Sequence, residues 1–256
     1  MLDELKSKAL EVVAEAINEE THFAVAFSGG IDSSLLAKIC KDIKRKNVIL
    51  LTVGFPYSKD IEFSKRISSK IGLPHKIHEI ETEDFNINLL RVVQKIRCKN
   101  ISHIENCIAF FYIAKLAKEN DLRVILTANG CDELFCGYNQ YRRIYEQGKT
   151  DLLKLMDEKI SNELLLTKEI EYITKEFMVT TRQPFLSQKF ISFAKDIPVD
   201  QKIKGSNDLI RKHILREFAL LIGVPRESAM KPKKALQYGS LIHKNFKKVS
   251  DFFDIY

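Results

Sequence analysis

Short apolar runs alternate with amphipathic stretches over the first half of the chain. Four of these runs have the length of buried strands and are bounded by turn residues. They lie at 22–28, 47–55, 74–80 and 123–130. Apolar residues at helical spacing fill the intervals over 32–46, 58–72, 82–97 and 103–120. Strands separated by helices of this length predict a doubly wound, mostly parallel α/β sheet with right-handed crossovers.

The second half of the chain has a different pattern. From about residue 140 onward the apolar residues keep only helical spacing, as in 150–177 and 206–223. We therefore expect a single domain over 1–256, in which an α/β core at 21–140 carries a helical C-terminal part at 141–256.

The composition is typical of a globular protein. Hydrophobic residues make up 45% of the chain, which is enough for a sizeable core. No apolar run approaches the roughly 18 residues that a membrane-spanning helix needs. Residues 1–20 alternate charged and apolar positions, which predicts an amphipathic helix rather than a signal peptide. We expect a cytoplasmic protein with no membrane segment.

The charge balance is basic, with a formal net charge of +7. A solvated basic surface explains this charge, and so does a polyanionic partner such as tRNA; both interpretations stay open. The five cysteines do not form the spacing pattern of a secreted disulfide framework.

The stretch AFSGGIDSS, residues 26–34, joins the first predicted strand to the first predicted helix. In a doubly wound sheet, ligands bind at the carboxyl ends of the strands, where backbone N–H groups and helix N-termini attract anions. Gly29 and Gly30 allow a phosphate to approach the backbone closely. Three hydroxyl groups can donate hydrogen bonds to its oxygens, from Ser28, Ser33 and Ser34.

Asp32 places a carboxylate in the same loop. Because like charges repel, a carboxylate beside phosphates makes sense if Mg²⁺ bridges the two. A helix N-cap would explain Asp32 alone but not the whole set of residues. The loop lacks the lysine and the spacing of a Walker P-loop. The loop therefore predicts a pyrophosphate-binding site of another kind.

Six stretches, in the same order, resemble the synthetase domain of the asparagine synthetase family. SGGIDSS resembles the pyrophosphate loop of the ATP-pyrophosphatase (PP-loop) superfamily, whose members split ATP into AMP and pyrophosphate and adenylate a substrate. The other five are TVGFPYSKD (52–60), NGCDELFCGYNQY (129–141), TRQPFLSQKF (181–190), KHILREFA (212–219) and KPKKALQYGS (231–240). The resemblance implies an adenine nucleotide alpha-hydrolase-like fold.

The resemblance also implies roles for individual residues. ATP and its pyrophosphate would contact Phe27, Ser28, Gly29, Gly30, Asp32, Ser33, Ser34, Val53, Thr127, Ala128 and Gly130. Asp32 and Asp132 would both bind Mg²⁺, as two carboxylates at neighbouring strand ends can. Lys233 or Lys234 would neutralise charge between the α- and β-phosphates, unless the pair belongs to a solvated loop. Arg182 would line the substrate side, unless it forms a structural salt bridge.

The acceptor side departs from the family pattern. The family motif has a Glu, linked to nitrogen transfer, at the position of Asn129, and an amide cannot accept a proton at neutral pH. Glu133 follows in the same stretch. The chain also starts directly on the synthetase fold, so we expect ammonia to be free or delivered by a separate glutaminase subunit. Free asparagine is therefore not the expected main product.

The cysteines near this stretch allow two interpretations. Cys131 and Cys136 replace a Ser and a Gly of the family motif, and Cys98 and Cys107 precede the fourth strand. Some PP-loop enzymes insert sulfur into tRNA with active-site cysteines or an iron–sulfur cluster. Small buried cysteines can also substitute for Ser and Gly without further purpose, so exposure decides between the interpretations.

The sequence thus predicts an ATP-dependent, AMP- and pyrophosphate-forming ligase or amidotransferase synthetase domain. It would adenylate a carboxylate-like small-molecule acceptor for attack by a nitrogen nucleophile. The alternatives are a tRNA-modifying sulfurtransferase on the PP-loop scaffold and a nucleotide-binding subunit that serves a separate glutaminase. Whether the chain forms a homodimer stays open.

Overall fold

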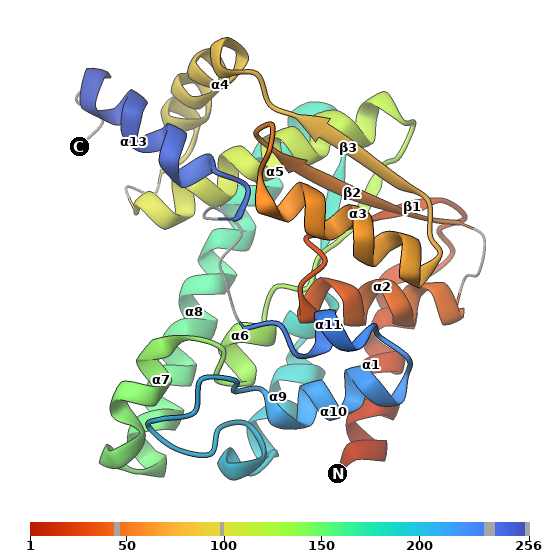
Figure 1. Ribbon diagram of the computed structural model, residues 1–256, viewed down its shortest axis with the longest axis vertical. Coiled ribbons are helices and arrows are strands. Elements are labelled where there is room, and N and C mark those ends of the chain that lie inside the picture. The colour runs from red at the N-terminus through yellow and green to blue at the C-terminus, as the bar shows by residue number, and fades with distance from the viewer. Residues whose placement is uncertain (44–46, 98–99, 233–238, 254–256) are drawn as a thin grey trace.

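A five-stranded parallel sheet forms the centre of the computed structural model, which describes residues 1–43, 47–97, 100–232 and 239–253. The strand order is β3-β2-β1-β4-β5 (Figure 1). The strands are β1 (Phe23–Ala26), β2 (Val48–Gly54), β3 (His75–Glu79), β4 (Val124–Leu126) and β5 (Thr180–Arg182). Every pairing is parallel, which confirms the predicted sheet class.

The fifth strand corrects the expectation that only helices follow residue 140. Thr180 to Arg182 pair with Val124 to Leu126, so β5 extends the sheet at the edge beyond β4. The strand has three residues, and only its central Thr181 is buried. A three-residue strand is too short to show an apolar run or an alternation. Its pairing depends on contact with β4, which is distant in the sequence.

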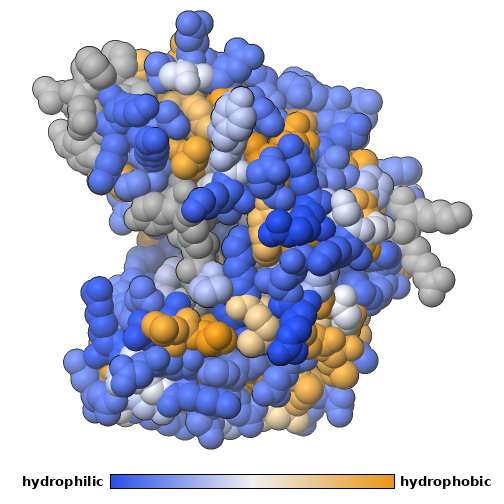
Figure 2. Space-filling model, viewed as in Figure 1, coloured by the Kyte–Doolittle hydropathy of each residue, from blue (hydrophilic) through white to orange (hydrophobic). Residues whose placement is uncertain are grey.

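Helices cover both faces of the sheet. The first half contributes α1 (Leu2–Ile17), α2 (Ile31–Ile43), α3 (Lys59–Ile71), α4 (Thr82–Lys95) and α5 (Ile101–Glu119). Phe23 and Val25 of β1 point toward the cluster that contains α1, α2 and α3, whereas Ala24 joins the cluster of α4 and α5. This alternation is the period of two of a strand that is buried on both faces. Hydrophilic residues cover most of the outer face seen in Figure 2.

The C-terminal half consists mainly of helices. They are α6 (Cys131–Leu134), α7 (Asn139–Ile144), α8 (Lys149–Thr174), α9 (Gln188–Asp196), α10 (His213–Leu221), α11 (Arg226–Ala229) and α13 (Ile242–Phe253), with short 3₁₀ turns at Tyr145–Gln147, Lys175–Phe177, Pro184–Leu186 and Val199–Gln201. Helix α8 runs the length of the molecule beside the sheet (Figure 1). Its residue Ile160 packs into one core and Leu166 into the other. Within the described ranges, no helix combines the length and apolarity needed to cross a membrane.

The helix predicted over 206–223 begins only at His213. Arg211 and Lys212 have φ angles of 51° and 55°, in the left-handed region that ordinary residues seldom adopt. The Asp208 carboxylate accepts hydrogen bonds from the backbone N–H groups of Ile210 (3.1 Å) and Arg211 (3.0 Å). The turn forms in a segment whose apolar residues have helical spacing, which is why the sequence predicted a helix there. The turn also determines where the side chain of Lys212 points.

Candidate active site

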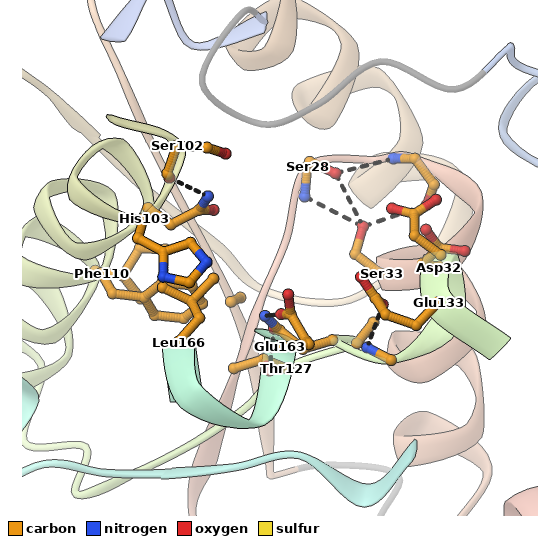
Figure 3. Close-up of a pocket in the computed structure, with 18 of the residues that line it drawn as sticks. Ser28, Asp32, Ser33, Ser102, His103, Phe110, Thr127, Glu133, Glu163 and Leu166 are labelled. Carbon is orange, nitrogen blue, oxygen red and sulfur yellow. Dashed lines mark hydrogen bonds between the residues drawn. The ribbon is translucent and has the colours of Figure 1, made fainter. Parts of the chain in front are cut away.

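A cavity of about 820 Å³ lies at the carboxyl ends of β1, β2 and β4. Figure 3 shows Ser28, Asp32 and Ser33 on one side of it and Ser102, His103 and Phe110 on the other. Thr127 and Glu163 lie between the two sides. The cavity stands at the edge of a parallel sheet where ligands bind in folds of this class.

The loop between β1 and α2 is held by its own hydrogen bonds. The Ser28 N–H donates to Ser33 Oγ (3.2 Å), and the Gly30 N–H donates to Ser28 Oγ (3.3 Å). Ser33 Oγ in turn donates to the Gly30 carbonyl (3.2 Å). Gly29 has a φ of 73°, and a Cβ there would come within 2.9 Å of the Phe63 ring. The loop is therefore pre-shaped beside the N-terminus of α2, as an anion site requires.

Most of the residues predicted for the nucleotide, the metal and the acceptor side line the cavity. These are Phe27, Ser28, Gly30, Asp32, Ser33, Val53, Thr127, Ala128, Asn129, Gly130, Asp132 and Glu133. Gly29 and Ser34 support the loop from behind. The Ser228 hydroxyl donates to the Gly29 carbonyl (2.7 Å) and lies 2.9 Å from the Ser34 hydroxyl.

Below the loop, a buried polar chain fixes the end of β1. Thr52 Oγ1 donates to the Phe27 carbonyl (2.5 Å), and His75 Nε2 lies 2.7 Å from Thr52 Oγ1. Burial, followed by the nearby Lys65 charge, lowers the pKa of His75 to about 4. The imidazole is therefore neutral at neutral pH. It holds the backbone of Phe27 where the predicted adenine contacts lie.

Asp32 and Asp132 meet at a buried ammonium group. Lys212 Nζ lies 2.7 Å and 2.8 Å from the two oxygens of Asp32 and 2.6 Å from Asp132 Oδ1. Burial alone would lower the pKa of Lys212, but Asp132 and Asp32 outweigh it and raise that pKa, so the ammonium stays charged. The left-handed turn before α10 aims this side chain between the carboxylates. Lys212 has no predicted role from the sequence, although it belongs to the stretch KHILREFA that resembles the family.

The oxygens of the same two carboxylates are suited to bind Mg²⁺. The side chain of Lys212 is 1% exposed, whereas those of Asp32 and Asp132 are 21% and 13% exposed and line the cavity. A hard cation can therefore approach them from the cavity, with phosphate oxygens and water as further ligands. In the part of the chain that the structure describes, no three His, Cys, Asp or Glu side chains form a metal-holding cluster.

Gly137 makes the close packing behind this pair possible. A Cβ at Gly137 would come within 1.9 Å of Asp132 Oδ1 and 2.5 Å of Lys212 Cε. The Gly137 carbonyl also accepts a hydrogen bond from Arg211 Nε (3.1 Å). Only glycine leaves room at this position for the carboxylate and the lysine together.

A second group of polar side chains lies after β4. Thr127 Oγ1 donates to Asn129 Oδ1 (2.5 Å), and Asn129 Nδ2 donates to Glu163 Oε1 (2.5 Å). Glu163 comes from α8 and lines the cavity. Sequence reasoning missed it, because it lies in a long amphipathic helix without a motif of its own.

Glu133 is a buried carboxyl that senses the charge of Glu163. It accepts hydrogen bonds from the Gly130 N–H (3.1 Å) and from the Tyr138 hydroxyl. Burial, together with the charges of Glu163 and Asp132, raises the pKa of Glu133 to about 8. Glu133 is therefore mostly protonated at neutral pH.

Four of the five cysteines lie in the described ranges and are buried: Cys40, Cys107, Cys131 and Cys136. Burial, reinforced by Asp32, raises the pKa of Cys131 well above its ordinary value. Burial likewise raises the pKa of Cys136 to about 12. Neither thiol has the exposed, electropositive setting of a reactive thiolate. Cys98 lies outside the described residues.

Arg182, predicted on the substrate side, is absent from the described residues that line the cavity. Its guanidinium donates to the Ala16 carbonyl (2.7 Å) and to Glu20 Oε1 (2.7 Å). These contacts tie β5 to the C-terminal end of α1. The structure therefore places Arg182 in the structural salt bridge that the sequence left open.

Lys233 and Lys234 lie outside the described residues. On one side of them, Lys231 and Pro232 line the cavity. On the other side, the Phe55 N–H donates to the Ser240 carbonyl (3.0 Å). Of these flanking residues, Lys231 and Pro232 thus lie at the site, and Ser240 is hydrogen-bonded to the end of β2.

A parallel sheet whose first strand ends in a Gly-rich anion-binding loop defines a nucleotide-binding α/β domain. The family model described as asparagine synthase matches residues 4–165 and 147–254. The chain belongs to the asparagine synthase family.

Two relatives and one solved structure illustrate the similarity. The chain is 30% identical over 244 residues to the putative asparagine synthetase [glutamine-hydrolyzing] 1 of Methanocaldococcus jannaschii, covering 83% of this chain and 44% of that protein. It is 25% identical over 234 residues to asparagine synthetase B [glutamine-hydrolyzing] of Escherichia coli K12, covering 84% and 41%. The chain thus spans less than half the length of these relatives. The NMN synthetase of Francisella tularensis shares the fold, with a TM-score of 0.52, 12% identity and coverage of 99% of this chain and 86% of that one.

Proposed function

We propose that this protein is an ATP-dependent ligase that forms AMP and pyrophosphate and makes an amide bond. A carboxylate-like oxygen of the acceptor attacks the α-phosphorus of ATP, and pyrophosphate leaves. A nitrogen nucleophile then attacks the acyl carbon, and AMP leaves. Family membership supports this reaction class, and the chemistry of the cavity supports it independently.

The observation that carries the proposal is the pairing of a preformed anion loop with two carboxylates at one strand edge. Ser28, Gly30 and Ser33 line the cavity, and their N–H and hydroxyl groups, which bond to one another in this structure, would turn to pyrophosphate when it binds. Mg²⁺ held by Asp32 and Asp132 would neutralise phosphate charge while the bond to the α-phosphorus breaks. Lys212 keeps these two carboxylates together before any ligand arrives. Preorganised charge of this kind commonly contributes several kcal/mol in the transition state.

The nitrogen source and the acceptor belong to the proposal as well. Ammonia, free or delivered by a separate glutaminase, is the proposed nucleophile, and a small carboxylic acid is the proposed acceptor. A tRNA-modifying sulfurtransferase gains no support from Cys131 or Cys136, because burial raises the pKa of both thiols.

ATP–pyrophosphate exchange tests the proposal directly. The purified protein is incubated with Mg²⁺, ATP and labelled pyrophosphate, with single amino acids or bulk tRNA as acceptors. Exchange that depends on a carboxylic acid, with AMP as the nucleotide product, is the expected result. ADP as the only product would refute the assignment. Exchange with tRNA alone would favour the sulfurtransferase, and tight ATP binding without turnover would favour a silent nucleotide-binding subunit.

A further inference from the structure

Nitrogen transfer releases a proton, so the acceptor face needs a group that can take it. Asn129 occupies the position where this role falls in the family pattern, and an amide cannot perform it. The structure shows a carboxylate directly against that amide. Glu163 Oε1 accepts a hydrogen bond from Asn129 Nδ2 at 2.5 Å, although the two residues are far apart in the sequence. Figure 3 shows Glu163 beside Thr127 in the middle of the cavity.

The orientation of the Asn129 amide follows from its other neighbour. Thr127 Oγ1 donates to Asn129 Oδ1 (2.5 Å), so the NH₂ edge of the amide faces Glu163. Thr127 is itself 1% exposed, and its N–H donates to the Arg182 carbonyl of β5 (2.9 Å). The sheet therefore fixes the orientation of the Asn129 amide, and the amide in turn fixes the position of one carboxylate oxygen of Glu163.

Helix α8 supplies Glu163 at the point where the helix passes from one core to the other. Ile160, one turn before Glu163, packs into the core that contains α1 and α2. Leu166, one turn after it, packs into the core that contains α5. Anchors on both sides hold this stretch of the helix against the cavity, so the carboxylate stands on a rigid element.

Glu133 is less suited to the same role. It is 3% exposed, and both of its oxygens accept hydrogen bonds from Gly130 and Tyr138. Glu163 is only partly buried, lines the cavity from α8 and has one oxygen against Asn129. Its place at the cavity makes Glu163, rather than Glu133, the carboxylate suited to accept the proton.

We propose that Glu163 is the catalytic residue that accepts the proton of the nitrogen nucleophile and that Asn129 is its positioning residue. This inference rests on the proposed function. In the step, the C–N bond forms and the bond from the acyl carbon to the AMP oxygen breaks. AMP leaves with the electron pair, and an N–H proton moves to Glu163. The carboxylate missing from position 129 is thus supplied from α8.

The test separates adenylation from nitrogen transfer in the whole chain. Glu163→Gln keeps the size of the side chain and removes its ability to accept a proton. ATP–pyrophosphate exchange, with L-aspartate and L-glutamate as probes, measures adenylation. Ammonium-dependent amide formation measures transfer. We expect exchange to stay within about threefold of wild type and amide formation to fall by about 10²- to 10⁴-fold.

Two further variants guard against a merely structural effect. Glu171→Gln makes the same change on the same helix at a side chain that is 48% exposed, and it should leave both rates unchanged. The double variant Asn129→Glu/Glu163→Gln swaps the carboxylate and the amide between the two positions. Its rate of amide formation should be at least tenfold higher than that of Glu163→Gln. Unchanged transfer in Glu163→Gln, or equal losses in both assays, would overturn the proposal. Absence of exchange in the wild-type protein with every acid would instead refute the proposed function, and this inference with it.

Discussion

The phosphate side and the acceptor side of the cavity are built in different ways. Ser28, Gly30 and Ser33 lie within six residues and bond to one another, so one short segment shapes the anion site. The acceptor side combines Asn129 after β4 with Glu163 from α8. Local backbone chemistry is sufficient for binding phosphate, because N–H groups and a helix N-terminus supply the charge. Proton transfer needs a particular side chain at a particular point, and any nearby element can provide it.

The carboxylate pair connects the two sides. Asp32 lies in the first turn of α2 on the phosphate side, and Asp132 lies in α6 on the acceptor side. Lys212 bridges them from a strained turn. A loss of charge at this junction should impair both half-reactions, whereas a change on the acceptor side alone should impair only transfer.

The largest effect is expected from removing one of the two carboxylates. Asp32→Asn and Asp132→Asn should each reduce ATP–pyrophosphate exchange by about 10³-fold or more, because phosphate charge is left uncompensated. The double variant should be scarcely worse than either single one, since both carboxylates act on one ion. Exchange rates of the three variants, with circular dichroism to confirm folding, provide the measurement.

Asp42→Asn is the matched control for this change. Asp42 lies on the same helix as Asp32, is 47% exposed and pairs with Lys38. It should exchange at the wild-type rate. Wild-type rates in Asp32→Asn as well would show that Asp32 serves only as a helix-end group.

Lys212→Met should be the most destabilising change at the junction. It removes the buried cation and leaves two carboxylates facing each other, which typically costs about 3 kcal/mol or more of unfolding free energy. Urea denaturation at neutral pH measures this loss. If the ammonium compensates the negative charges of Asp32 and Asp132, adding Asp132→Asn to Lys212→Met should recover part of the lost unfolding free energy. A further loss in that double variant would contradict the assignment.

Glu133 makes a pH-dependent contribution to stability. Its pKa in the folded protein is about 8, against an ordinary value of 4.5 in the unfolded chain. Between these values the unfolded chain releases a proton that the folded protein keeps, so stability falls as pH rises. Glu133→Gln stays neutral and should lack this fall. The unfolding free energy of wild type should therefore drop relative to the variant by about 2 kcal/mol between about pH 6 and pH 7.5.

Parallel denaturation series of wild type and Glu133→Gln at several pH values would show this divergence. Curves that run parallel across the window would mean that Glu133 is ionised in the folded protein.

The phosphate side and the acceptor side also differ in how well the sequence predicts them. Residues 23–26 form a buried strand, and the short segment that follows leads directly into α2 at Ile31, so apolar spacing and loop chemistry are sufficient to place them. Glu163 has the polarity of any outward-facing position of an amphipathic helix, and its contact with Asn129 exists only after folding. Lys212 lies within apolar spacing that imitates a helix, and the backbone bonds of Asp208 override that pattern. Long-range pairing and strained turns have no local signal.

The substrate-side role that the family resemblance implies for Arg182 is not the one its contacts indicate. Replacing Arg182 should have the smallest effect. Its guanidinium donates to Ala16 and Glu20, so Arg182→Gln loses a tie between β5 and α1 rather than a substrate contact. The pair is partly exposed, so we expect a loss of about 1 kcal/mol in unfolding free energy. The apparent KM for ATP and the ratio of transfer to exchange should stay at wild-type values. Glu20→Gln should cause a smaller loss, because the Ala16 hydrogen bond remains. A rise of tenfold or more in the KM for the acceptor, without a loss of stability, would instead return Arg182 to the substrate side.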